Sequence, residues 1–297
     1  MKILITGASG LVGSALVPAL KSDGHEIISL VRSAPKRESE VQWEPEREVK
    51  GAAKLEGIGA AVHLAGENLG DGRWTEEKKR RIRDSRVVGT RVLCNALLKL
   101  DRPPQTLISS SAIGFYGNRG SETLIEESSV GDDFLAKICD EWERATDPLK
   151  EKGVRVTHAR FGIILSNKGG ALAKMLTPFK LGIGGKLGDG KQYMSWIAID
   201  DIVSAVRYIL KNENLSGPLN LTAPNPVTNK EFTEALGKTL SRPTFLGVPE
   251  FALKIMFGEM AENTILSSAR VLPKRLQDAG YKFLFPTLET ALKHLLK

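Results

Sequence analysis

The sequence contains few cysteines and histidines and lacks any long apolar run. Its 297 residues include only Cys94 and Cys139, too few for a disulfide framework, which suits a reducing compartment. The four histidines are scattered, without a second His or Cys at metal-site spacing, so we expect no bound metal. No apolar segment approaches the roughly 20 residues of a membrane span, and the first predicted strand begins at Lys2, leaving no room for a signal peptide. We therefore expect a cytoplasmic protein.

A strong excess of one charge is also missing. The net charge is +7, and the densest basic run, residues 78–83, lies at the start of a predicted helix. We interpret this run as a solvated helix face near an anionic cofactor, because neither interleaved aromatic residues nor groove-reading elements accompany it. We expect a small-molecule substrate, with no nucleic acid and no membrane among the partners. The oligomeric state stays open.

The amino terminus carries the strongest motif. An apolar run at residues 2–6 is followed by glycines at positions 7, 10 and 13 and then by a helical pattern. This order is typical of a dinucleotide-binding unit, in which Gly7 permits the turn, Gly10 admits the pyrophosphate and Gly13 brings the helix close to the sheet. A purely structural turn is the alternative. We expect cofactor contacts from Gly7, Ser9, Gly10, Leu11 and Val12.

The end of the second predicted strand indicates which dinucleotide is bound. Residues 26–32 read as a buried parallel strand, and the chain continues with Arg32 and Ser33 where an NAD site usually has a carboxylate for the ribose 2′-hydroxyl. A guanidinium and a hydroxyl suit a 2′-phosphate, which a carboxylate would repel. The sequence therefore predicts NADP(H). The alternative is that Arg32 is an ordinary solvated strand end.

Strand and helix patterns alternate from residue 1 to about 165, which predicts an α/β fold with a doubly wound, parallel, Rossmann-type sheet. Glycines then crowd residues 162–190, as in loops that line a cleft. The pattern then predicts a strand at 193–199, a helix at 202–210 capped by Asp200 and Asp201, and a strand at 218–222. A capping box at 228–231 opens another helix. We expect a Rossmann domain of residues 1–165 with 193–222, and a smaller, mostly helical substrate domain of 166–192 and 223–297.

Several further motifs point to one family. They are residues 64–68, 85–86, 111–117, 169–172, 195–197 with 200–201, 271–276 and 280–281. Together with the glycine turn they resemble the extended short-chain dehydrogenase/reductases, in particular the atypical NAD(P)-dependent epimerase/dehydratase-like group with a small C-terminal domain. The resemblance covers essentially the whole chain. It implies a bound NADP(H) contacted by Leu64, Ala65, Gly66, Arg86 and the backbone near Ile164. A plain surface role is the alternative for Arg86.

The catalytic pair of that superfamily is missing. Its members normally use Tyr-x-x-x-Lys, in which the tyrosine moves a proton and the lysine lowers the tyrosine pKa. No tyrosine here has a lysine four positions later, and alignment on Glu143 places Leu135 and Cys139 at the two positions. Ser111 matches the catalytic serine of the superfamily. An enzyme built on this pattern therefore needs another proton donor.

Tyr116 and Glu67 are the candidates for that donor. Tyr116 follows Ser111 at the carboxyl end of a predicted parallel strand, where such sheets place their ligands. Glu67 lies in a loop where a partly apolar cleft can raise the pKa of a carboxyl group. The structural alternative for Tyr116 is an aromatic residue at the rim of the site. The structural alternative for Glu67 is a residue that makes hydrogen bonds within its loop. Gln192, Ser195 and Trp196 are expected on the substrate side.

Two functions are compatible with these observations. The first is an NADP(H)-dependent oxidoreductase, similar to nucleoside-sugar epimerases, that acts on an unknown small substrate through a non-standard acid. The second is a catalytically silent NADP(H)-binding sensor or scaffold, because the Tyr/Lys pair is absent. The resemblance also suggests a link of this second function to division of cells or plastids.

Overall fold

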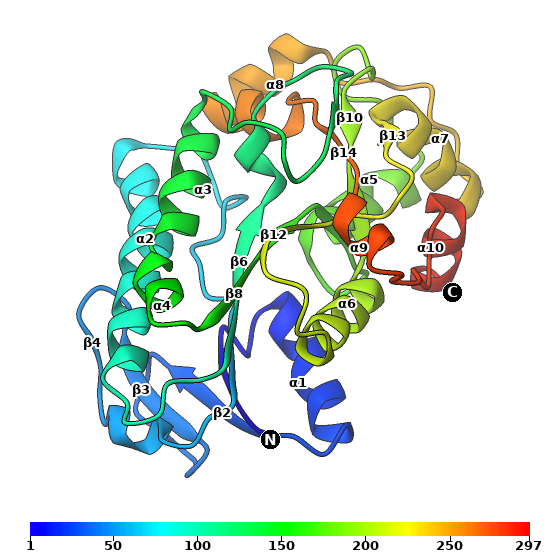
Figure 1. Ribbon diagram of the computed structural model, residues 1–297. Coiled ribbons are helices and arrows are strands. Elements are labelled where there is room, and N and C mark those ends of the chain that lie inside the picture. Colours follow the sequence, from blue (N-terminus) through cyan, green and yellow to red (C-terminus); the bar gives the residue numbers. More distant parts are fainter.

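A twisted eight-stranded sheet forms the centre of the computed structural model, which describes residues 1–297 (Figure 1). The strand order is β12-β8-β6-β5-β1-β2-β3-β4, and every neighbouring pair is parallel except β3 and β4. This confirms the predicted doubly wound sheet. The strands are β1 (Lys2–Thr6), β2 (Glu26–Val31), β3 (Glu40–Glu44), β4 (Glu48–Val49), β5 (Ala60–His63), β6 (Thr106–Ala112), β8 (Arg155–Phe161) and β12 (Gly217–Leu221).

Helices cover both faces of this sheet because successive strand residues point to opposite sides. Ile3 and Ile5 of β1 belong to a core with α1 (Leu11–Ser22) and α6 (Ile199–Lys211). Leu4 belongs to a second core, on the face covered by α2 (Glu76–Leu98), and α3 (Phe134–Arg144) and α4 (Asp147–Glu151) pack against α2. In Figure 1, α2, α3 and α4 lie on the left of the sheet, and α1 and α6 lie on the right.

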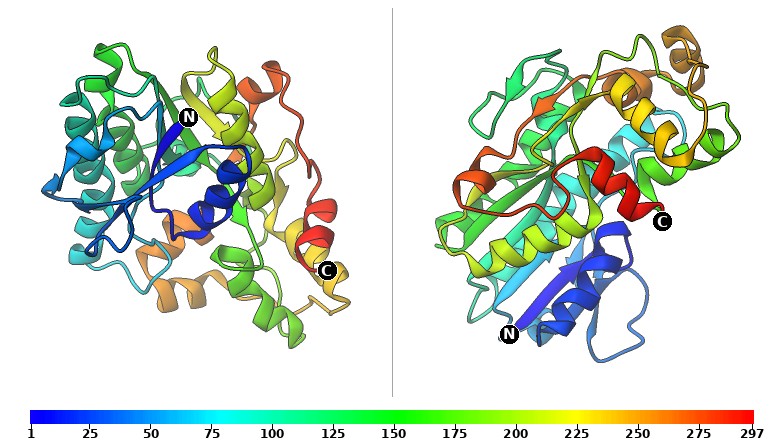
Figure 2. Two further views of the ribbon diagram at one scale, coloured as in Figure 1. Left: turned by 90° about the horizontal axis from the view of Figure 1, so that it is seen from below. Right: turned by 90° about the vertical axis from the view of Figure 1, so that its right-hand side faces the viewer.

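A third core builds a lobe at the carboxyl edge of the sheet, which we call the C-terminal lobe. Its apolar residues come mainly from α5 (Gly170–Lys180), α7 (Asn229–Leu240) and α10 (Leu288–Leu295). The helices α8 (Glu250–Phe257) and α9 (Lys274–Asp278) and three short strand pairs complete this part of the chain (Figure 2). The pairs are β9 (Ile163–Leu165) with β11 (Trp196–Ala198), β10 (Tyr193–Met194) with β13 (Val227–Thr228), and β7 (Thr123–Leu124) with β14 (Arg270–Val271). The predicted domain boundaries stay a prediction.

Short single-turn elements complete the chain: η1 (Ala52–Leu55), η2 (Ile113–Tyr116) and the π-helical η3 (Ala261–Ile265). The capping box of Thr228 and Glu231 at the start of α7 is confirmed. The strand expected at 193–199 is instead divided between two small sheets, and β3 and β4 lack a counterpart in the sequence prediction. None of the helices combines the length and apolar character that crossing a membrane requires.

The sequence analysis expected Asp201 to cap α6. Instead, Asp201 connects this helix to the carboxyl-terminal segment. Helix α6 begins at Ile199, and the fully buried Asp201 carboxylate accepts hydrogen bonds from backbone N–H groups of Leu284 (2.7 Å) and Phe285 (3.0 Å). The Tyr281 hydroxyl donates to the backbone carbonyl of Asp201 at 3.0 Å. Burial raises the pKa of Asp201, and these donors offset part of that rise.

Replacing Asp201 by Ala is expected to lower the free energy of unfolding by about 2–3 kcal/mol, because two N–H groups lose a charged acceptor. Asp200→Ala is the matched control, since Asp200 is 42% exposed and has only a His294 nitrogen at 3.4 Å. That neighbouring change is expected to cost less than about 0.5 kcal/mol. Urea unfolding of both variants measures the difference, and equal losses would contradict the assignment.

Candidate functional site

The turn after β1 brings the start of α1 very close to the backbone of the neighbouring strands. Gly7 has φ +67°, and a Cβ added there would lie 2.9 Å from the Leu64 carbonyl carbon. A Cβ at Gly13 would lie 2.2 Å from the Gly7 oxygen, so only glycine permits this approach. The backbone N–H groups of Leu11 and Val12 have no hydrogen-bond partner, and Ser9 and Gly10 are exposed. These amides form an anion-binding helix start at the switch point between β1 and β5.

A buried polar network holds the segment that follows β5. The Thr6 hydroxyl oxygen accepts hydrogen bonds from the backbone N–H groups of Leu64 (3.0 Å) and Ala65 (3.1 Å). It lies 2.7 Å from Nδ1 of His63, whose Nε2 lies 3.0 Å from the Thr90 hydroxyl. The Thr6 proton therefore points to Nδ1, and Nε2 carries the only ring proton. Complete burial lowers the pKa of His63 to about 4, in agreement with a neutral ring.

Two cations near this turn form no ion pair, although the Glu67 carboxylate interacts electrostatically with both. Arg32 and Ser33 are exposed just beyond β2, and Arg32 has no ion pair or side-chain hydrogen bond. Arg86 lies next to Gly66: a Cβ added to Gly66 would be 3.6 Å from the guanidinium carbon of Arg86. Its Nη atoms donate only to the backbone carbonyls of Ile82 (3.0 Å) and Glu67 (3.1 Å). Burial lowers the pKa of Arg86, a cost that a bound anion would relieve.

The start of α5, which follows β9, packs against the start of α1. A Cβ at Gly170, where φ is +71°, would lie 3.2 Å from the Leu11 side chain and 3.4 Å from the Ile164 carbonyl oxygen. The half-buried Ile164 pairs with Ile197 in the small sheet of β9 and β11. Ile164 and Leu11, which the sequence analysis placed on the cofactor, thus both lie next to Gly170.

Ser111 takes part in a buried ionic network that the sequence analysis did not identify. Its hydroxyl donates to Oε1 of Glu143 at 2.7 Å, and Arg160 binds both carboxylate oxygens through Nε and Nη2, each at 2.8 Å. Burial disfavours the ionised carboxyl group, but the Arg160 guanidinium outweighs this effect and lowers the pKa of Glu143. Ser111 on β6 and Arg160 on β8 are register partners. The available signal was a second arginine, Arg160, near the end of a predicted parallel strand.

The positions aligned with the missing Tyr and Lys face this network from α3. A Cβ on Gly114 would lie 3.5 Å from Cβ of Leu135 and 3.9 Å from Sγ of Cys139. Both side chains are buried, and burial raises the pKa of the Cys139 thiol to about 12. The face that carries the proton donor and its cation in the superfamily pattern is therefore apolar and uncharged here.

Tyr116 lies inside the protein. Its side chain is fully buried, its hydroxyl donates to Oδ1 of Asn220 at 2.7 Å, and the hydroxyl oxygen accepts from Nη1 of Arg160 at 2.9 Å. Burial raises the Tyr116 pKa to about 12, and Arg160 and Asn220 oppose that rise only in part. These contacts favour a structural role over proton donation.

Glu67 is an anion, contrary to the expected raised pKa. Lys78 Nζ lies 2.7 Å from its carboxylate, and this hydrogen bond lowers the pKa of Glu67.

Two expected substrate-side residues are core residues: Ser195 donates to the Ala269 carbonyl at 2.7 Å, and Trp196 is fully buried. Gln192 does line a cavity of about 360 Å³, beside Asn118 and Leu266.

The His63 imidazole is expected to stay neutral down to about pH 4. The unfolded chain takes up this proton near pH 6.5, so the free energy of unfolding should fall by up to about 3 kcal/mol as the pH drops from 6.5 to 4. NMR titration of labelled histidine measures the midpoint, with His63→Gln identifying the resonance. A midpoint near 6.5 would contradict the neutral network.

Comparison with known proteins agrees with this geometry. The model of the NAD dependent epimerase/dehydratase family matches residues 3–221, and that of a domain of unknown function, DUF1731, matches residues 248–295. An epimerase family protein of Mycobacterium bovis is 43% identical over 98% of this chain and 96% of its own length.

Two solved structures share the fold over nearly all of this chain. The human epimerase family protein SDR39U1, crystallised with NADPH, is 32% identical with a TM-score of 0.91, over 99% of both chains. A nucleoside-diphosphate sugar epimerase from Corynebacterium glutamicum is 38% identical with a TM-score of 0.83, over 100% of this chain and 58% of that longer one. The chain therefore belongs to the NAD-dependent epimerase/dehydratase family.

Proposed function

We propose that the crevice above the β1–α1 turn binds NADP(H). The observation that carries this proposal is that free amides at the start of α1 occur together with two cations, Arg32 and Arg86, that form no ion pair. The NADPH in the human relative's structure supports it. The pyrophosphate would bind near Gly7, Ser9, Gly10, Leu11 and Val12 and the 2′-phosphate near Arg32 and Ser33, with Leu64, Ala65, Gly66, Arg86 and Ile164 along the rest of the cofactor.

The residues present fit this dinucleotide. A Cβ at Gly10 would lie 3.2 Å from the Gly7 oxygen, so glycine leaves the backbone open above the turn. The guanidinium and hydroxyl beyond β2 match a phosphate in charge and hydrogen bonding. When bound, NADP(H) supplies hydride chemistry at its nicotinamide ring. The protein is expected to act in the cytoplasm.

Arg32→Ala is expected to weaken NADPH binding roughly ten- to hundredfold, because a charge-assisted contact to the 2′-phosphate is lost. NADH affinity should stay within about twofold, since NADH lacks that phosphate. Arg102→Ala is the matched control, because Arg102 is exposed beyond α2, before the amino end of β6. Calorimetric titration measures all three proteins. Equal losses for NADPH and NADH would refute the assignment of Arg32.

We propose further that the protein is an oxidoreductase, similar to nucleoside-sugar epimerases, with Ser111 contacting the substrate. Ser111 is itself buried, but because its hydroxyl donates to the Glu143 carboxylate, its oxygen keeps lone pairs that can accept a hydrogen bond from a substrate hydroxyl. Arg160 keeps Glu143 ionised and fixed. This arrangement favours a substrate that presents an alcohol. The description of the corynebacterial relative as a nucleoside-diphosphate sugar epimerase supports a nucleotide sugar.

Ser111→Ala is expected to lower kcat/KM by about 10²–10⁴ while leaving the NADPH dissociation constant unchanged. The assay follows NADP(H) absorbance over a panel of nucleotide sugars and other alcohols or carbonyl compounds. Glu67→Gln and Tyr116→Phe test the two other candidate donors, and we expect only small rate effects because both groups are engaged in structural contacts. Full activity of Ser111→Ala would contradict the role of Ser111.

A sensor or scaffold that responds to NADP(H) occupancy is the second candidate function. The apolar Leu135 and Cys139 at the positions of the superfamily's acid and cation favour it. Tight NADPH binding without turnover across the whole panel would select this function. Turnover that depends on Ser111 would exclude it.

A further inference from the structure

The C-terminal lobe exposes large apolar side chains at one place. Leu181 and Ile183, just beyond α5, are 70% and 57% exposed, and Phe245 and Leu246 are 81% and 46% exposed. The two segments are joined by an antiparallel bridge between Gly185 and Phe245 and by a hydrogen bond of 2.9 Å from Arg242 Nε to the Lys180 carbonyl. We call residues 180–186 and 241–247 the basic tip. Clustered exposure of this kind marks an interaction surface.

The charges around the basic tip have one sign. Residues 166–188 and 235–249 contain no Asp or Glu. They carry six cations, Lys168, Lys174, Lys180, Lys186, Lys238 and Arg242. The acids next to these segments are engaged by other lysines: Lys191 lies 3.9 Å from Asp189, Lys230 lies 3.9 Å from Glu234, and Lys254 lies 2.8 Å from Glu250. Lys174 lies 3.9 Å from Asp71, whereas Lys180, Lys186 and Arg242 of the tip itself form no ion pair, so the tip carries a local excess of positive charge.

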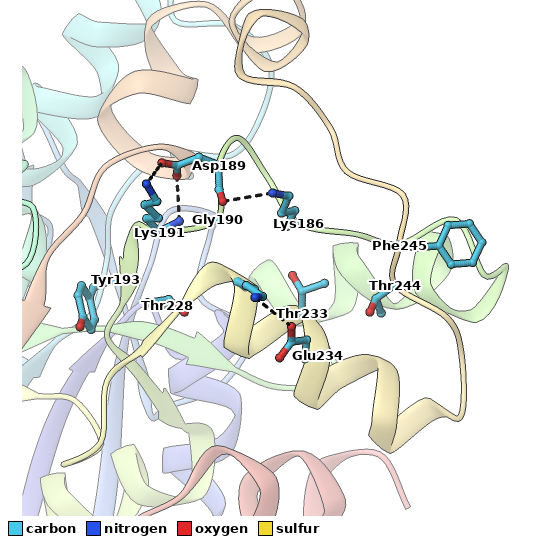
Figure 3. Close-up of a pocket in the computed structure, with 11 residues that line it drawn as sticks. Lys186, Asp189, Gly190, Lys191, Tyr193, Thr228, Thr233, Glu234, Thr244 and Phe245 are labelled. Atoms are coloured by element: carbon cyan, nitrogen blue, oxygen red, sulfur yellow. Dashed lines mark hydrogen bonds and ion pairs between the residues drawn. The ribbon is translucent and has the colours of Figure 1, made fainter.

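A cavity of about 710 Å³ opens beside the tip, between residues 186–191 and α7 (Figure 3). Lys186, Lys191 and Lys230 line it together with three threonines, and the carboxylates of Asp189 and Glu234 belong to the same lining. Ammonium and hydroxyl groups are suitable donors for phosphate oxygens. Phe245 belongs to the same rim, and its ring projects outward from the lobe in Figure 3. Apolar and phosphate-binding groups thus adjoin each other.

We propose that the basic tip docks on an anionic lipid surface, with Phe245, Leu246, Leu181 and Ile183 entering the headgroup region and the lysines contacting lipid phosphates. Apolar side chains at loop ends among cations match the chemistry of that interface. A second copy of the chain is disfavoured as the partner, because it would bring positive charges next to positive charges. An acidic protein is disfavoured because the apolar side chains of the tip protrude and do not form a groove. Phe251, Ile255 and Met256 of α8, which follows residues 241–247 in the chain, are exposed apolar residues as well.

The test is flotation of the full chain with vesicles of phosphatidylcholine alone or with about one third phosphatidylglycerol. We expect at least tenfold stronger binding to the anionic vesicles, weakening with salt. Phe245→Ser should reduce binding about tenfold and still fold, because the ring is 81% exposed. Leu284→Ser, at a site 56% exposed outside the tip, is the control and should bind like the parent.

A charge series completes the experiment. Replacing Lys180, Lys186 and Lys238 by Gln should lower binding by roughly a hundredfold, at about fivefold per lysine. The matched control replaces the exposed Lys99, Lys152 and Lys282 and should keep most of the binding. Equal binding to neutral vesicles, no binding to either kind, or equal losses in both triple variants would overturn the proposal. Binding to polyglutamate without vesicle binding would also overturn it, in favour of an acidic protein.

Discussion

The close contact between helix α1 and the turn after β1 is the constraint on which the candidate site depends. Gly13 permits a backbone approach that any side chain would block, since its Cβ would lie 2.2 Å from the Gly7 oxygen. The approach directs the free amides of Leu11 and Val12 toward the gap between β1 and β5. Arg32 and Arg86 then lie on two sides of a ready anion site. Neither arginine forms an ion pair, which leaves both available for the proposed phosphorylated ligand.

The chemistry around Ser111 depends on which positions of α3 are polar. Leu135 and Cys139 make one buried part of α3 apolar, whereas Glu143, further along α3, forms a buried ion pair with Arg160 of β8 beside Ser111. When a carboxylate accepts the hydrogen bond of the serine hydroxyl, the serine oxygen can still accept a hydrogen bond from another donor. This arrangement is the basis for the proposal that Ser111 accepts a hydrogen bond from a substrate hydroxyl group.

Local patterns predicted the local structure. The glycine turn and the capping box of Thr228 were readable because turn geometry and helix capping depend on residues a few positions apart. The partners of Arg160, Tyr116 and Glu67 were not readable, because each contact joins elements distant in sequence. The strand pair β3 and β4 is short and lies at the sheet edge, so its signal was weak. The basic tip likewise arises only where residues 180–186 meet residues 241–247.

The central claim is that the start of α1 receives the cofactor's phosphates. Hydrogen exchange of the backbone amides, followed residue by residue with and without saturating NADPH, tests it most directly. The account predicts that the Leu11 and Val12 amides, unpartnered in the structure, become strongly protected when NADPH is added. Unchanged exchange at both positions, with protection elsewhere or nowhere, would contradict it.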